Sequence, residues 1–313
     1  MSCPRLTVCI PVYNSAGFLA AAIESVLEQS FTDFELLILD DGSSDGSRDI
    51  VAGYAARDAR IVTRLHQQNL GMVPNWNACL GEARGEYIKY LFGDDLLASR
   101  DALAKMVALL DGDSTIALVA SARNIIDHES KQLKLTSCFP ADLVLSGEEV
   151  INRCLFRQKN LIGEPSAVMF RKNQALRGYD LRYSQLVDLE MWFHLLEQGK
   201  FCYLAEPLAC FRIHDDQQTK KNVRNLVHVE EMITLLAEYG SRPYLTVGPL
   251  TRRFLLYNQL FRIWKAYRNN LLDRDAALAR ITPHCPPRKF LALIPLYKVL
   301  CPIWKLSTAL VAK

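Results

Sequence analysis

Short apolar runs of strand length alternate with helix-like stretches through the first 120 residues, and this alternation limits the possible folds more than any other feature. The stretches between the runs repeat their apolar residues at helical spacing, as residues 18–27 do. Strands that alternate with helices in this way form a mainly parallel sheet that helices cover on both faces. The sequence therefore predicts an α/β fold. The predicted strands are residues 6–12, 34–39, 61–65, 87–92 and 116–120, and the predicted helices are residues 18–27, 50–54, 73–83 and 102–110.

The alternation is lost at residues 123–160, for which we expect loops and short helices over one end of the sheet. It returns with a strand at 166–170, a helix at 186–198 and two short strands at 201–204 and 208–213. After about residue 218 the pattern is helical, so we expect an α/β domain at 1–217 and a helical region at 218–313.

The charge balance changes at the same place. The whole chain has a formal net charge of only +3, but residues 1–217 carry 21 Lys and Arg against 29 Asp and Glu, whereas residues 218–313 carry 16 against 5. The net charges of the two parts are therefore −8 and +11. In the C-terminal region the basic residues lie among apolar ones, which argues against a nucleic-acid-binding surface.

Two explanations of the C-terminal region stay open. A basic amphipathic surface with Trp264, Tyr297 and Trp304 fits attachment to an anionic membrane face. Alternatively, the helices pack on the first domain and present a solvated basic face. Pro295 and Pro302 interrupt the final apolar stretch, so the sequence does not predict a helix that spans a membrane.

The cysteines indicate a reducing compartment. There are nine, they show no CxxC spacing, and most lie inside apolar runs. Buried thiols in a cytoplasmic protein explain this better than disulfides or a zinc site. The charge-free stretch 6–23 imitates a signal peptide, but Pro11 and Asn14 interrupt it and the helical spacing continues to Leu27.

Two pairs of carboxylates directly follow predicted strands. Asp40 and Asp41 precede a Gly-Ser turn, and Asp94 and Asp95 follow a glycine. The carboxyl ends of parallel strands are where such sheets bind ligands. The first pair could accept hydrogen bonds from a nucleobase or a ribose, and the second suits a hard divalent cation bridged to a diphosphate. Ordinary turn and helix-cap roles remain the alternative for both pairs.

A third acidic position, Asp188, lies in the predicted helix 186–198. Helical spacing places Trp192 on the same face, so a base and an aromatic platform could meet one ligand. Taken alone, Asp188 has the simpler explanation of a surface helix residue.

Seven short motifs occur in an order that resembles the family 2 nucleotide-sugar glycosyltransferases of the GT-A fold. Each motif is weak, but the ordered set is specific and covers about residues 5–217. The motifs are Ile10-Pro11-Val12-Tyr13-Asn14, Leu39-Asp40-Asp41-Gly42-Ser43-Ser44-Asp45, Asn69-Leu70-Gly71, Gly85-Glu86-Tyr87-Ile88, Gly93-Asp94-Asp95, Asp188 to Trp192, and Phe211-Arg212-Ile213-His214.

The resemblance implies a donor site in residues 1–217. Pro11, Tyr13 and Asp41 would hold the nucleoside, and Asp94 and Asp95 would occupy the donor-sugar and metal position, with Asp95 as the direct ligand of Mg²⁺ or Mn²⁺.

On the acceptor side, the resemblance implies that Asp188 is the general base, with Trp192 beside it and Glu164 in an acceptor-side loop. His214 would reach the metal or the diphosphate. A cation stabilises the leaving diphosphate, and a carboxylate on the opposite face of the sugar activates the incoming hydroxyl, which gives inversion.

Three positions depart from the resemblance. Phe92 stands where many relatives carry an acid, Trp76 where they often carry an arginine, and Val187 where a glutamate is frequent. The first two weaken the expected metal and diphosphate contacts.

We therefore expect an inverting transferase that moves a sugar from a nucleoside diphosphate, UDP in the first instance, to a hydroxyl of a glycan or lipid-linked acceptor. It would serve cell-surface polysaccharide synthesis from the cytoplasm or the inner face of the membrane. A sugar-nucleotide pyrophosphorylase and an inactive sugar-nucleotide-binding scaffold are the alternatives. The former would need a Gly-rich phosphate loop with Arg or Lys after the first strand, and residues 11–17 contain neither basic residue.

Overall fold

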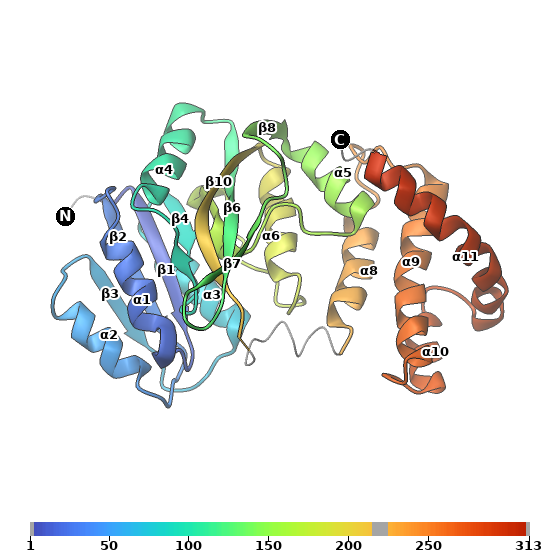
Figure 1. Cartoon of the computed structure of the whole chain (residues 1–313), viewed down its shortest axis with the longest axis horizontal. Helices are drawn as coiled ribbons and strands as arrows, with labels where there is room; N and C mark the ends of the chain where they lie inside the picture. Colours follow the sequence, from blue (N-terminus) through green and yellow to red (C-terminus); the bar gives the residue numbers. More distant parts are fainter. Residues whose placement is uncertain (1–2, 215–224, 311–313) are drawn as a thin grey trace. The chain divides into compact units, whose positions relative to one another are not determined.

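The structure is a computed structural model that describes residues 3–214 and 225–310, with side chains described as far as residue 302. The chain divides into two compact units (Figure 1). Unit 1 comprises residues 1–151 and 160–217, and unit 2 comprises residues 152–159 and 218–313.

One ten-stranded mixed sheet forms the centre of unit 1. Eight strands follow the order β3-β2-β1-β4-β9-β6-β10-β5, and off this path β7 pairs with β6 and β8 pairs with β10. Neighbouring strands from β3 to β4 are parallel, β9 runs antiparallel to both its neighbours, and β6 is parallel to β10. The predicted α/β fold is therefore confirmed. The strands are β1 (Leu6–Val12), β2 (Phe34–Asp40), β3 (Ile61–Leu65), β4 (Tyr87–Tyr90), β5 (Leu96–Leu97), β6 (Ile116–Ile126), β7 (Gln132–Thr136), β8 (Leu143–Ser146), β9 (Val168–Arg171) and β10 (Lys200–Arg212).

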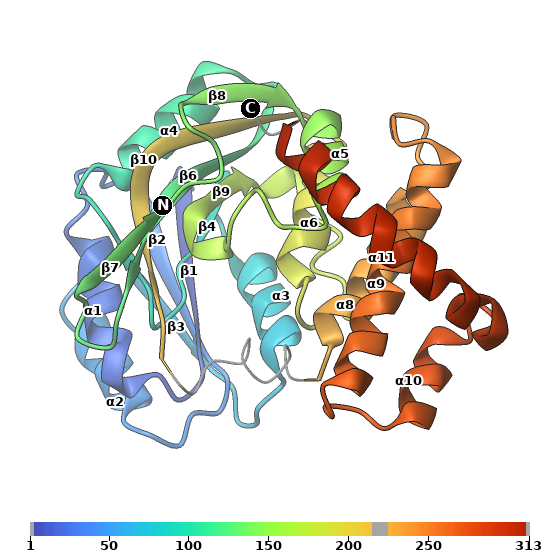
Figure 2. The same ribbon diagram turned by 45° about the vertical axis from the view of Figure 1, so that its right-hand side comes forward.

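Helices cover both faces of this sheet (Figure 2). Alternate residues of β1, beginning with Leu6, join apolar residues of α1, α2 and α4 in one buried core. On the opposite face the Sγ atom of Cys9 lies 4.0 Å from the carbonyl oxygen of Cys79 in α3, and the ring of Trp192 in α6 packs against Phe170 in β9. The helices are α1 (Ala16–Leu27), α2 (Ser47–Ala55), α3 (Met72–Glu82), α4 (Ala102–Gly112), α5 (Gly147–Arg157) and α6 (Val187–Leu196).

The structure corrects two details of the predicted strands. Residues 201–204 and 208–212 belong to one long strand, β10, whose register against β6 shifts on either side of Pro207; Ile213 lies just past its end. The segment 123–160, for which we expected loops and short helices, contains the end of β6, the strands β7 and β8, and the helix α5.

Unit 2 is helical, with a core of its own. The helices α8 (Val227–Tyr239), α9 (Pro249–Arg268), α10 (Arg274–Ile281) and α11 (Pro287–Leu310) enclose a cluster that includes Ile233, Leu260 and Phe290. In the part of the chain that the structure describes, no helix is long and apolar enough to cross a membrane.

Two of the aromatic residues that we expected on the surface of this region, Trp264 and Tyr297, pack partly buried against the core of unit 2. The Tyr297 ring stacks on Phe261 with 3.7 Å between centroids, and Trp264 lies against Tyr267 and Phe290. Both side chains are only partly buried, and a membrane-facing role of this region stays a prediction. The side chain of Trp304 lies outside the described residues.

Candidate functional site

The loops after β1 and β2 are tied together at the carboxyl edge of the sheet. Val12 and Asp40 pair in register, and the Asn14 side chain accepts a hydrogen bond of 2.9 Å from the Ser44 N–H. Gly42 has φ +77°, and a Cβ there would lie 2.8 Å from the Asn69 nitrogen, so only glycine fits this turn. Tyr13, with 53% of its surface exposed, extends from this edge.

Asp41 is engaged by the backbone. Its carboxylate is 2% exposed and accepts hydrogen bonds from the N–H groups of Leu70 (2.7 Å) and Gly71 (3.0 Å). The side chain that we expect to bind a nucleobase thus also holds the loop that leads into α3. Asp40 has the turn role, because it accepts from the Ser43 N–H and from Arg48. Pro11 lies half-buried near the end of β1.

The two acids after β4 differ in exposure. The Asp94 side chain is 26% exposed, and its Oδ2 lies 3.0 Å from Nε2 of His214. Asp95 is 1% exposed; its Oδ1 accepts the Arg212 N–H at 2.9 Å, and its Oδ2 has no hydrogen-bond partner among the described residues. Burial, and then the charge of Asp94, raise the pKa of Asp95 well above its ordinary value. The more exposed carboxylate is thus Asp94, whereas Asp95 is the residue that we expected to bind the metal directly.

Arg212 organises this acid pair, and its role was missed from the sequence. The side chain is buried and donates to the carbonyl oxygens of Asp94 and Asp127, both at 2.7 Å, and to the Ser130 hydroxyl at 2.9 Å. Its guanidinium also lies 4.6 Å from the centroid of the Phe18 ring. The sequence places Arg212 next to an expected ligand, but a role that depends on backbone carbonyls leaves no residue pattern.

Asp188 lies in the first turn of α6, where Asn160 contacts it. The distance from Asn160 Nδ2 to Asp188 Oδ2 is 3.2 Å, and the other carboxylate oxygen accepts the Leu189 N–H at 2.7 Å. Asp188 is only partly buried, as a group that meets a substrate needs to be.

Trp192 requires a correction. Its ring is fully buried, so it does not present the aromatic platform that we expected. Its Nε1 instead donates to the Gly163 carbonyl oxygen at 3.0 Å. Helical spacing did place it one turn from Asp188, but on a face that packs against the sheet.

Glu164 follows Gly163 and forms an ion pair with Arg123. Nη2 of Arg123 lies 2.8 Å from Glu164 Oε1, and 31% of the Glu164 side chain remains exposed. The expected acceptor-side acid is therefore held by a cation but still reaches the surface.

The turn η1 (Pro165–Ala167) follows Glu164 and contacts the loop that leads to Asp94 and Asp95. The Ser166 hydroxyl accepts the Phe92 N–H at 3.1 Å, and its proximity lowers the pKa of Asp95, against the larger effect of burial. The buried ammonium of Lys89 in β4 donates to the carbonyl oxygens of Pro165 and Ser166. Burial lowers the pKa of Lys89 from 10.5 to about 7.

The two main departures from the expected pattern contact each other. The rings of Trp76 and Phe92 stack with 5.0 Å between centroids, and Tyr179 meets Trp76 edge-on at 5.3 Å. An aromatic layer therefore stands beside the Asp94 loop.

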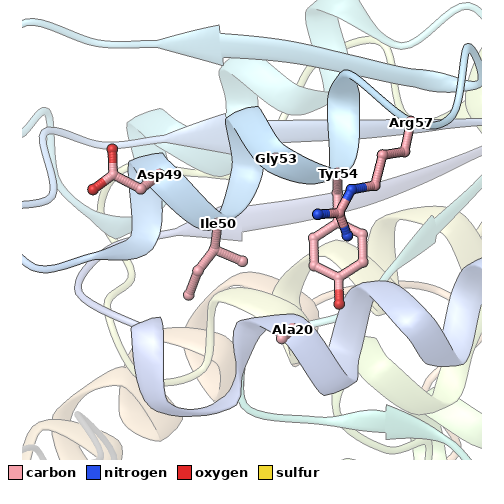
Figure 3. Close-up of a pocket in the computed structure, with 6 residues that line it drawn as sticks. All are labelled: Ala20, Asp49, Ile50, Gly53, Tyr54 and Arg57. Carbon is pink, nitrogen blue, oxygen red and sulfur yellow. The ribbon is translucent and has the colours of Figure 1, made fainter.

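A shallow hollow of about 350 Å³ opens elsewhere, between α1 and α2 (Figure 3). Tyr54 and Arg57 line it, and the Tyr54 hydroxyl donates to Glu24 at 2.5 Å. None of its lining residues is a predicted site residue.

The chain offers few protein ligands for a metal. Within residues 3–214 and 225–310, no group of three or more His, Cys, Asp or Glu side chains is placed to hold one. Asp94 and His214 supply one oxygen and one nitrogen at hydrogen-bond distance from each other. Such a pair fits Mg²⁺ or Mn²⁺ when a diphosphate and water supply the remaining ligands.

Comparison with known proteins identifies related chains. Residues 7–177 match the family model described as Glycosyl transferase family 2. Chondroitin synthase of Escherichia coli is 26% identical over 252 residues, which cover 79% of this chain and 35% of that protein.

Solved structures share the fold. Residues 1–349 of Staphylococcus aureus TarS in complex with UDP-GlcNAc align with a TM-score of 0.67 and 14% identity, covering 92% of this chain and 83% of that one. The mannosyltransferase PcManGT from Pyrobaculum calidifontis, in complex with GDP-Man and Mn²⁺, aligns with a TM-score of 0.57 and 16% identity, covering 99% and 84%.

Proposed function

The chain belongs to glycosyl transferase family 2, and from this premise we propose that it moves a sugar, with inversion, from a UDP-linked donor to a hydroxyl of a glycan or lipid-linked acceptor. The complex of TarS with UDP-GlcNAc supports the donor class. The name of chondroitin synthase supports a role in polysaccharide synthesis.

The turn at residues 163–167 carries this proposal, because it touches both acidic groups. Gly163 accepts from Trp192 and from Asn160, which also contacts Asp188. Three residues later, Ser166 accepts from the backbone of the Asp94 loop. A donor at Asp94 and an acceptor at Asp188 would thus meet across one short, buried turn.

Asp188 is the general base of the proposed reaction. Its carboxylate takes the proton of the acceptor hydroxyl while that oxygen bonds to the anomeric carbon of the donor sugar. The bond from this carbon to the diphosphate breaks on the opposite face, and the diphosphate leaves with the bonding electrons. Attack opposite to the leaving group inverts the anomeric configuration.

Asp94 and His214 hold the leaving-group side. These two residues would hold a divalent cation, Mg²⁺ or Mn²⁺, whose positive charge would stabilise the leaving diphosphate. Asp95 would orient the Asp94 loop by accepting the Arg212 N–H, and it would not coordinate the cation directly. Pro11, Tyr13 and Asp41 form the nucleoside end, where exposed Tyr13 is placed to stack on a base.

We assign the transfer reaction to residues 1–217 and membrane attachment to residues 218–313. Three exposed apolar side chains of α11, Leu296, Val299 and Leu300, flank exposed Lys298. Together with the net charge of +11 for residues 218–313, they suit peripheral binding to the anionic inner face of a membrane.

The test is donor turnover. Wild type and Asp188→Asn are incubated with a panel of nucleotide sugars, Mn²⁺ and candidate acceptors, and free UDP is measured. We expect release with one donor and a loss of at least about 100-fold in the variant, in the range for removal of a general base. Equal rates of UDP release in wild type and Asp188→Asn would overturn Asp188 as the base. Binding of a nucleotide sugar without release of UDP would indicate a scaffold, and consumption of a sugar 1-phosphate would indicate a pyrophosphorylase.

A further inference from the structure

Asn160 uses every hydrogen-bonding position of its side chain to connect Asp188 with the loop that carries Glu164. We propose that Asn160 is a positioning residue that fixes the Asp188 carboxylate relative to the acceptor-side loop at residues 160–164. The inference rests on the proposed function, because it concerns the geometry of the same base.

The backbone fixes the orientation of the Asn160 amide. Its Oδ1 accepts two hydrogen bonds, from the N–H groups of Ile162 (2.9 Å) and Gly163 (3.0 Å). An amide NH₂ group cannot accept these bonds, so the opposite flip would leave two backbone donors facing donors. The Nδ2 group must therefore point the other way, and it lies 3.2 Å from both Asp188 Oδ2 and the Gly163 carbonyl oxygen.

The carboxylate of Asp188 is thus held at both oxygens. Oδ1 accepts the Leu189 N–H at 2.7 Å and Oδ2 accepts Asn160 Nδ2. A carboxylate oxygen can accept more than one hydrogen bond, so a base held in this way can also meet a substrate hydroxyl. A general base must lie within hydrogen-bond reach of the proton that it takes, and a misplacement of about 1 Å can reduce the rate 100-fold.

The same side chain sets the start of the acceptor loop. Gly163 has a φ of +130°, a backbone conformation that residues with a side chain rarely adopt. Its carbonyl oxygen accepts hydrogen bonds from Asn160 and from Trp192 of α6. Glu164 follows directly and pairs with Arg123. A shift of Asn160 would move the base and the acceptor loop together, which a bond to only one of them would not do.

Two substitutions separate these effects. Asn160→Asp keeps an oxygen that accepts from Ile162 and Gly163 but places a carboxylate against Asp188. We expect kcat to fall about 10- to 100-fold and the acid limb of the pH–rate profile to move up by about one unit, because a neighbouring like charge disfavours ionisation of the base. Asn160→Ala also removes the loop bonds, so its KM for the acceptor should rise as well.

Asn173→Asp is the matched control, because Asn173 is exposed in the turn η2 (Lys172–Gln174). UDP affinity measured by calorimetry should be the same in all variants, which shows that they are folded. An unshifted acid limb in active, UDP-binding Asn160→Asp would overturn the positioning role while leaving the proposed function intact. Full activity of Asp188→Asn would overturn both.

Discussion

Lys89 is a buried basic residue that contacts the turn η1 of the candidate site. Replacing it with methionine tests whether burial lowers the pKa of its side chain. The side chain lies in β4, in a residue that is 1% exposed, and its Nζ donates to the carbonyl oxygens of Pro165 and Ser166. Burial lowers its pKa from 10.5 to about 7, although the negative charge of Asp95 acts in the opposite direction. Methionine has a similar length and does not titrate.

The sign of the effect follows from proton binding. Between about pH 7 and 10.5 the unfolded chain holds the Lys89 proton while the folded chain has released it. The stabilising contribution is therefore present above the unfolded pKa and is lost as the pH falls towards 7. For a pKa that moves from 10.5 to about 7, linkage gives a gain of about 2 kcal/mol in unfolding free energy between about pH 7 and 9.

The assay is urea-induced unfolding of wild type and Lys89→Met at intervals across this pH range. Taking the difference between the two proteins cancels the titration of all other groups, and we expect wild type to gain about 2 kcal/mol relative to the variant. Lys105→Met is the control, because that ammonium lies at the surface against Glu206 and should leave the difference flat. Parallel pH curves for wild type and Lys89→Met would refute the argument from burial.

Three further predictions address the site and unit 2. Asp94→Ala should abolish the enhancement of UDP binding by Mn²⁺ in calorimetry, because His214 alone remains as a protein ligand; an unchanged enhancement would exclude this pair. Trp192→Phe should lower the unfolding free energy by about 1 kcal/mol and raise the KM for the acceptor, because the Gly163 carbonyl loses a donor. Unchanged kinetics would show that this hydrogen bond does not position the acceptor loop. Full-length protein should float with anionic liposomes in low salt and be released by high salt, and Leu296→Glu should prevent flotation; binding to neutral vesicles alone would contradict the charge argument.

The alternation of strands and helices could be predicted because it is a local property. A strand buried on both faces is mostly apolar, as β1 and β2 are, and a helix repeats its apolar residues at helical spacing. The same logic failed at β10, where Glu206 and Pro207 look like a turn. The strand continues there because its pairing with β6 shifts register, and only the partner strand determines that.

The sequence predicted candidate residues for the site. It did not predict how deeply each one is buried or which groups it contacts. Helical spacing put Trp192 and Asp188 on one side of α6, but it could not tell that Trp192 is buried while Asp188 is only partly so. The order of the acids after β4 did not reveal that Asp95 points inward and Asp94 towards His214. Asn160 was missed altogether, because its partners are backbone groups and a carboxylate that is distant in sequence.

The anomeric configuration of the product tests the central claim most directly. Once a donor is found, the anomeric configuration of the transferred sugar is determined by proton NMR of the product, in which the glycosidic bond fixes the anomeric centre. Attack by a hydroxyl activated by Asp188, opposite to the diphosphate, predicts a β-linked product from an α-linked donor. An α-linked product would contradict the account, because retention requires a different arrangement of groups around the anomeric carbon.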